Sequence, residues 1–138
     1  MKKILLIALA PFLLTACADK QQFQDAVLAR VQKDQKLQEE QHLKEYKIDL
    51  ERLTRCVVDT SSAKMPGVFP FDPTRMMAYR NYAKMLTLDK SADPKKALEE
   101  LRTDFGSPKG LAEANSNFTE SMLDCYSAMV SETETDAK

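Results

Sequence analysis

Residues 107–131 read SPKGLAEANSNFTESMLDCYSAMVS, and this stretch carries the strongest fold signal in the chain. A Ser-Pro pair opens it, and this pair favours a helix start because Ser caps a helix and Pro suits its first turn. Apolar residues then recur three or four positions apart, which places them on one helical face: Leu111, Ala114, Phe118, Met122, Cys125 and Met129. We therefore predict a helix that buries one side and carries Cys125 toward the core.

Two earlier stretches begin with the same kind of signal. Asp72-Pro73 opens a predicted helix that continues to about Leu88, and Asp93-Pro94 opens another that continues to Phe105. Gly106 follows directly and suits the left-handed position after a helix end. The first of these helices is apolar nearly all round, so we expect it to be the most enclosed element.

The chain from Asp19 to about Ser61 has no Gly and no Pro, which predicts one long helix. Its first part, from Gln21 to Lys44, is mostly polar and lacks a sustained heptad, so we interpret it as a solvated helical stalk. The later part has an apolar face beside which Cys56 lies; this face contains Tyr46, Leu50, Leu53 and Val57. No run of alternating β-branched residues indicates a sheet. The predicted fold is all-α, a small four-helix body with a long N-terminal helix.

The first sixteen residues have the pattern of a secretion signal. Lys2 and Lys3 give a cationic start, and the apolar run of residues 4–14 follows. This run is too short to span a bilayer as a helix. A positive start, a short apolar core and small residues before a cut site are typical of a cleaved secretory segment.

Leu14-Thr15-Ala16-Cys17 resembles the lipobox of bacterial lipoproteins. The resemblance implies cleavage before Cys17 and lipidation of its sulfur by diacylglycerol, with palmitate among the usual acyl chains. Acylation would hold the protein on a membrane. In enterobacterial lipoproteins an Asp directly after the Cys favours the inner membrane. Ala18 occupies that place here, which implies the outer membrane and its periplasmic face, although Asp19 one position later leaves the inner membrane as an alternative. An ordinary secretory signal with a Cys beside it is the other interpretation.

Cleavage before Cys17 leaves 122 of the 138 residues and removes Lys2 and Lys3, so the formal charge moves from -1 to -3. Four segments are expected: signal peptide 1–16, lipid-anchored polar helical stalk 17–45, helical domain 46–131 and flexible tail 132–138. A helical stalk of about 25 residues would hold the domain roughly 35–40 Å from its anchor.

Cys56 and Cys125 are the two cysteines left once Cys17 is assigned to lipid. An oxidising compartment favours a disulfide between them. Closure of a loop of this length contributes on the order of 4 kcal/mol in the chain-entropy model. Two buried free thiols or intermolecular pairing are the alternatives.

The sequence contains few residues that could form a catalytic site, and we predict that the protein is not an enzyme. Its only histidine, His42, lies in the polar stretch, and it has no partner set for nucleophilic catalysis. The single histidine, together with cysteines already assigned to lipid and to a disulfide, leaves no set of zinc ligands. We therefore predict neither a metal nor a cofactor. We expect no small-molecule substrate, and the mildly acidic charge gives no reason to expect nucleic acid.

A candidate partner surface lies between Met65 and Tyr82, where aromatic residues, Met and Arg gather around a loop with three prolines. These residue types are enriched at protein interfaces, and a stiff loop lowers the ordering cost of binding. The candidate binding residues are Phe69, Phe71, Arg75, Tyr79 and Arg80. In the alternative interpretation, the loop folds back and its apolar side chains plug the bundle.

The size, the lipobox, the helix content and the cysteine pair resemble in outline the pilotins, small lipoproteins that escort secretin subunits to the outer membrane. This resemblance implies a non-catalytic lipoprotein that binds or organises an envelope protein. An entry-exclusion type of lipoprotein is a second binding hypothesis. A structural hypothesis is a self-associating envelope lipoprotein whose stalk forms a coiled coil.

Overall fold

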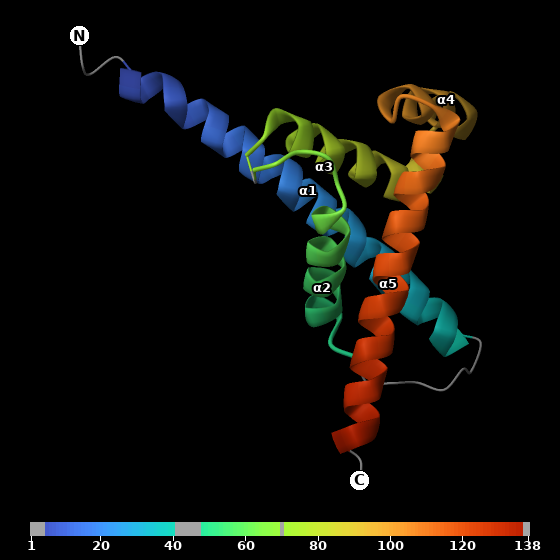
Figure 1. Cartoon of the computed structure of the whole chain (residues 1–138). Helices are drawn as coiled ribbons and strands as arrows, with labels where there is room; N and C mark the ends of the chain where they lie inside the picture. Colours follow the sequence, from blue (N-terminus) through green and yellow to red (C-terminus); the bar gives the residue numbers. More distant parts are fainter. Residues whose placement is uncertain (1–4, 41–47, 70, 137–138) are drawn as a thin grey trace.

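The computed structural model describes residues 5–40, 48–69 and 71–136, the side chains of residues 5–16 and 136 excepted. Within these ranges the chain forms five α-helices, one 3-10 helix and no strand. The elements are α1 (Leu5–Glu40), α2 (Leu50–Ala63), α3 (Pro73–Leu86), η1 (Leu88–Lys90), α4 (Pro94–Asp104) and α5 (Pro108–Asp136). Figure 1 shows α1 and α5 as the two long helices; α2 packs on both of them, and α3 packs along α1. The all-α class and the long first helix are confirmed.

The solvated stalk is wrong as an interpretation, because α1 packs on the body. Phe23 and Val27 are fully buried, and Val31 is nearly so. The Phe23 ring stacks on Tyr79 and meets Tyr82 edge-on, with both pairs of ring centroids 5.7 Å apart. Phe23, Val27 and Val31 therefore belong to the main core, and they are not available for a coiled coil with another copy.

The single helix predicted from Asp19 to about Ser61 is also wrong, since α1 ends at Glu40 and α2 begins at Leu50. The Asp49 carboxylate caps α2 and accepts the backbone N–H groups of Glu51 and Arg52 at 2.9 and 3.2 Å. Asp is a preferred capping residue, and it starts a helix without help from Gly or Pro. His42 and Tyr46 lie outside the described residues.

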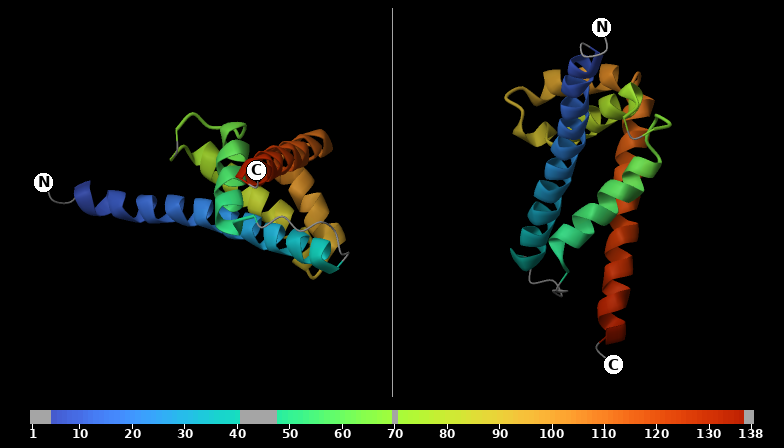
Figure 2. Two further views of the ribbon diagram at one scale, coloured as in Figure 1. Left: turned by 90° about the horizontal axis from the view of Figure 1, so that it is seen from below. Right: turned by 90° about the vertical axis from the view of Figure 1, so that its left-hand side faces the viewer.

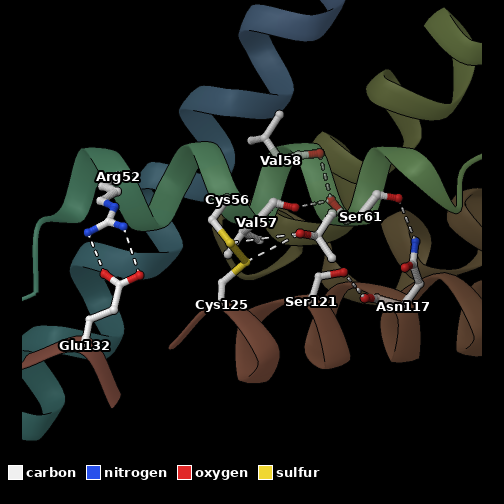
Figure 3. Close-up of a disulfide and its surroundings, with 10 residues drawn as sticks. Arg52, Cys56, Val57, Val58, Ser61, Asn117, Ser121, Cys125 and Glu132 are labelled. Carbon is white, nitrogen blue, oxygen red and sulfur yellow. Dashed lines mark hydrogen bonds and ion pairs between the residues drawn. A yellow bond between two sulfur atoms is a disulfide. The ribbon is translucent and has the colours of Figure 1, made fainter. Parts of the chain in front are cut away.

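A disulfide joins α2 to α5, which confirms the predicted pair. Cys56 and Cys125 are bonded, with their Cα atoms 5.9 Å apart. Figure 3 shows Arg52 of α2 paired with Glu132 of α5 on one side of this bridge. Because α5 continues to Asp136 and uses Glu132 in this pair, the predicted flexible tail of residues 132–138 is wrong for its first five residues.

Small and polar residues let α2 and α5 approach closely on the other side of the bridge. Ser61 and Ser121 are fully buried, and their hydroxyls donate to backbone carbonyls of their own helices. Asn117 donates to the carbonyl of Ser61 at 3.1 Å (Figure 3). It also donates to the Tyr82 hydroxyl at 2.8 Å. Burial raises the pKa of Tyr82 above its ordinary value. Asn117 thus links α2, α3 and α5 through one buried amide.

The predicted starts of α3, α4 and α5 are confirmed by their caps. Asp72 and Asp93 accept backbone N–H groups of the following turn, and the Ser107 hydroxyl does the same for Gly110. Gly106 has a positive φ of 78°, as expected after the end of α4. Helix α3 is well enclosed, whereas α4 buries only Leu101 and lies at the edge of the fold.

Candidate functional site

A groove of about 440 Å³ opens between the second half of α1 and the middle of α5. The ends of the neighbouring helices close its base, because Leu53 of α2 and Met85 of α3 both line it. Phe118 and Met122 contribute further apolar surface from α5. A cavity of this size lies in the range of protein pockets that bind ligands or segments of a partner.

The two long helices supply the groove through regularly spaced residues. On α5, the lining residues recur at helical intervals from Asn115 to Tyr126, which is about 16 Å of helix. On α1 they extend from Arg30 to Gln38, about 12 Å. The groove therefore runs for two to three turns along each helix. Leu123 stands on its rim with 62 % of its surface exposed.

Polar groups edge the apolar groove and pair with each other. Arg30 and Asp34 form an ion pair across one turn of α1, at 3.2 Å. The Tyr126 hydroxyl lies 3.4 Å from the Gln38 amide oxygen, so it joins α5 to α1 across the groove. The rim is neutral in sum, and its amide and hydroxyl groups can exchange these contacts for contacts with a bound molecule.

The predicted partner surface divides into two groups. Phe69 and Phe71 are 68 % and 60 % exposed, so the alternative in which these rings plug the bundle is wrong. Arg80 is exposed as well, and it pairs with Asp19 of α1 at 3.5 Å. Tyr79 is wrong as a binding residue, because its ring is buried against Phe23.

Arg75 is half-buried and holds the loop before α3. Its guanidinium donates to the carbonyls of Ser62 and Gly67, the latter at 2.6 Å. These carbonyls belong to the last turn of α2 and to the loop, where backbone acceptors lack helical partners. Gly67 has a φ of 102°, and a Cβ there would come within 2.8 Å of the Arg75 backbone nitrogen. Arg75 therefore acts in the structure of the loop rather than as a free binding residue.

Asp72 closes the same loop from its other end. Its carboxylate accepts the backbone N–H of Val68 at 3.1 Å and that of Thr74 at 2.8 Å. These two hydrogen bonds, led by the one from Val68, lower the pKa of Asp72. The loop consequently has a defined shape, in which Val68, Phe69 and Phe71 point away from the core.

Cys17 lies on α1, where its side chain is exposed and makes no disulfide. Within the described residues, no group of three or more His, Cys, Asp or Glu side chains could hold a metal ion. The same part of the chain contains no helix that is both long enough and apolar enough to cross a membrane.

Comparisons with known protein families, with curated proteins and with solved structures find no match for this chain. The candidate site therefore stands on its own geometry. The sequence pattern did not reveal the groove, because its two walls come from helices that are more than seventy residues apart in the chain.

Proposed function

We propose that the protein is a non-catalytic lipoprotein of the outer membrane that binds a helical segment of an envelope protein in the groove between α1 and α5. The observation that carries this proposal is the open groove itself. It has an apolar base, a polar neutral rim and a length of two to three helical turns. An amphipathic helix binds in such a groove through apolar residues three and four positions apart.

The lipid anchor in this proposal rests on the lipobox and on the exposed position of Cys17. We expect Cys17→Ser to lose all incorporation of an alkyne fatty acid, because the thioether that starts lipidation cannot form. Metabolic labelling followed by a gel measures this directly. Equal labelling of wild type and variant would remove the anchor from the proposal.

Binding in the groove is tested by a photo-crosslinking amino acid placed at Leu123. Leu123 is on the rim and exposed, so the substitution should leave the fold intact. Illumination of intact cells should give one discrete adduct. Mass spectrometry should locate the crosslink in a partner segment whose apolar residues recur three and four apart.

Met77 offers a matched control, since it is an apolar α3 residue of similar exposure, 51 % against 62 %, outside this groove. The same crosslinker at Met77 should give no such adduct. Crosslinks from Leu123 only to a second copy of the chain would favour the self-associating structural lipoprotein instead. Crosslinks only to small apolar molecules would identify the groove as a ligand site and contradict a protein partner.

A further inference from the structure

Three apolar side chains stand exposed on the loop between α2 and α3, which we name the Phe loop and define as residues 66–69 and 71–72. Val68 is 82 % exposed, and Phe69 and Phe71 are exposed by 68 % and 60 %. Adjacent exposed apolar residues on a structured loop mark a binding surface for a protein or a membrane. The position of the Phe loop relative to Cys17 decides between these two.

Helix α3 runs in the same direction as α1. The ring contact between Phe23 and Tyr79 lies early in the shared interface, and the ion pair between Lys33 and Asp89 lies ten residues later on both segments, Asp89 being in η1. Tyr79 thus marks the level of Phe23 along α1. This register relates each position along α3 to a position along α1, and therefore to Cys17.

Pro73 precedes Tyr79 by six residues and Cys17 precedes Phe23 by six residues, so each lies about 9 Å of helix before this contact. The start of α3 therefore lies at about the level of Cys17, and the Phe loop comes directly before it at the same end of the body. Figure 2 agrees: in its left view, the segment joining α2 to α3 reaches further toward that end than any other part of the body except α1 itself. The same relation is visible in Figure 1.

We propose that the Phe loop enters the headgroup region of the membrane that holds Cys17, so that the body rests on the bilayer at two points. This inference depends on the lipid anchor of the proposed function. A bilayer surface beside Cys17 would meet the Phe loop before any other part of the body. Aromatic side chains favour the membrane interface, and apolar loop residues gain from burial there.

Hydrogen bonds from neighbouring residues hold the Phe loop in one shape. Arg75 holds its first half through the carbonyls of Ser62 and Gly67, and Asp72 holds Val68 through its backbone N–H. Its shape is therefore set before binding, which lowers the entropy cost of insertion. Three side chains would bind a membrane weakly by themselves. The lipid on Cys17 supplies a high effective concentration, so weak partitioning is sufficient.

The chain contains no tryptophan, so one introduced Trp is an unambiguous reporter. We would purify the lipidated protein carrying Phe69→Trp and, separately, Phe71→Trp. Each would be reconstituted into vesicles of phosphatidylethanolamine and phosphatidylglycerol, with or without acyl chains brominated near the headgroup. In both variants the emission should shift to the blue on reconstitution and be mostly lost in brominated vesicles.

Leu123→Trp provides the control, because Leu123 is similarly exposed but lines the groove beside the second half of α1, away from Cys17. Its emission should be the same in both kinds of vesicle. Flotation of the vesicles reports the anchor separately. Protein that floats while the Phe69→Trp and Phe71→Trp emission is unquenched would overturn the Phe loop inference and leave the lipoprotein proposal standing. Protein that fails to float would overturn the anchor, and the inference with it.

Discussion

Phe23→Ala is expected to lower the free energy of unfolding by about 3–5 kcal/mol, the usual cost of deleting a fully buried ring. The side chain has no exposed surface, and it contacts the rings of Tyr79 and Tyr82. Removing it leaves a cavity where α1 meets α3. A small domain has a total stability of about 5–15 kcal/mol, so this loss is a large share. Urea unfolding of the lipid-free chain, followed by circular dichroism, measures it.

Leu37→Ala is the matched control, because Leu37 lies on the same helix and is 44 % exposed. It should change the stability by no more than about 0.5 kcal/mol, as surface substitutions usually do. Equal and small losses in the two variants would mean that α1 does not pack on the body. They would restore the solvated stalk that the sequence suggested.

The spacing of its apolar residues explains why the first part of α1 was predicted to be a solvated stalk. Phe23, Val27 and Val31 are spaced four residues apart, so they form a stripe of two turns. This stripe is too short for a coiled coil, and polar residues surround it. A helix that packs on its own chain needs only a few such positions, however, because α3 supplies the rest of the apolar surface. The absence of a heptad repeat argued against a coiled coil, but it did not exclude packing against a helix of the same chain.

The packing of α1 also shortens the distance at which the proposed lipid anchor would hold the body. A stalk to Lys44 would hold the body roughly 35–40 Å from the lipid. With Phe23 buried and Asp19 paired to Arg80, the body begins only a few residues after Cys17. The proposed contact between the Phe loop and the bilayer depends on this packing.

Arg75 illustrates a role that the sequence could not reveal. A charged residue on a largely apolar helix was expected to reach solvent or a partner. The backbone carbonyls of Ser62 and Gly67 satisfy its guanidinium instead. The chain fold brings those carbonyls to Arg75, and no residue pattern encodes their position. Helix starts, by contrast, were predictable because Asp72, Asp93 and Ser107 act within their own turns.

The disulfide was predictable for a different reason. The expected oxidising compartment, the number of cysteines and their positions on or beside two inward helical faces were sufficient to predict it.

Removal of the disulfide is the second large effect that we expect. Cys56→Ala with Cys125→Ala should lower the free energy of unfolding by about 2–5 kcal/mol, because the unfolded chain regains the freedom of a long loop. Urea unfolding of the lipid-free chain, with Cys17 replaced by Ser in every variant, measures the loss.

Single replacements distinguish the contribution of the disulfide to stability from that of the packing of the two sulfur atoms. If the bridge dominates, each single replacement should cost nearly as much as the double one, since either removes the same bond. Cys125 is almost fully buried, so a purely packing effect would instead appear mainly in Cys125→Ala. A thiol-reactive mass tag provides the direct check: no tag should add before reduction and two after it. Tagging of both cysteines without reductant would show that no bridge joins α2 to α5, and that noncovalent contacts such as the Asn117 hydrogen bond and the Arg52–Glu132 pair hold the two helices together.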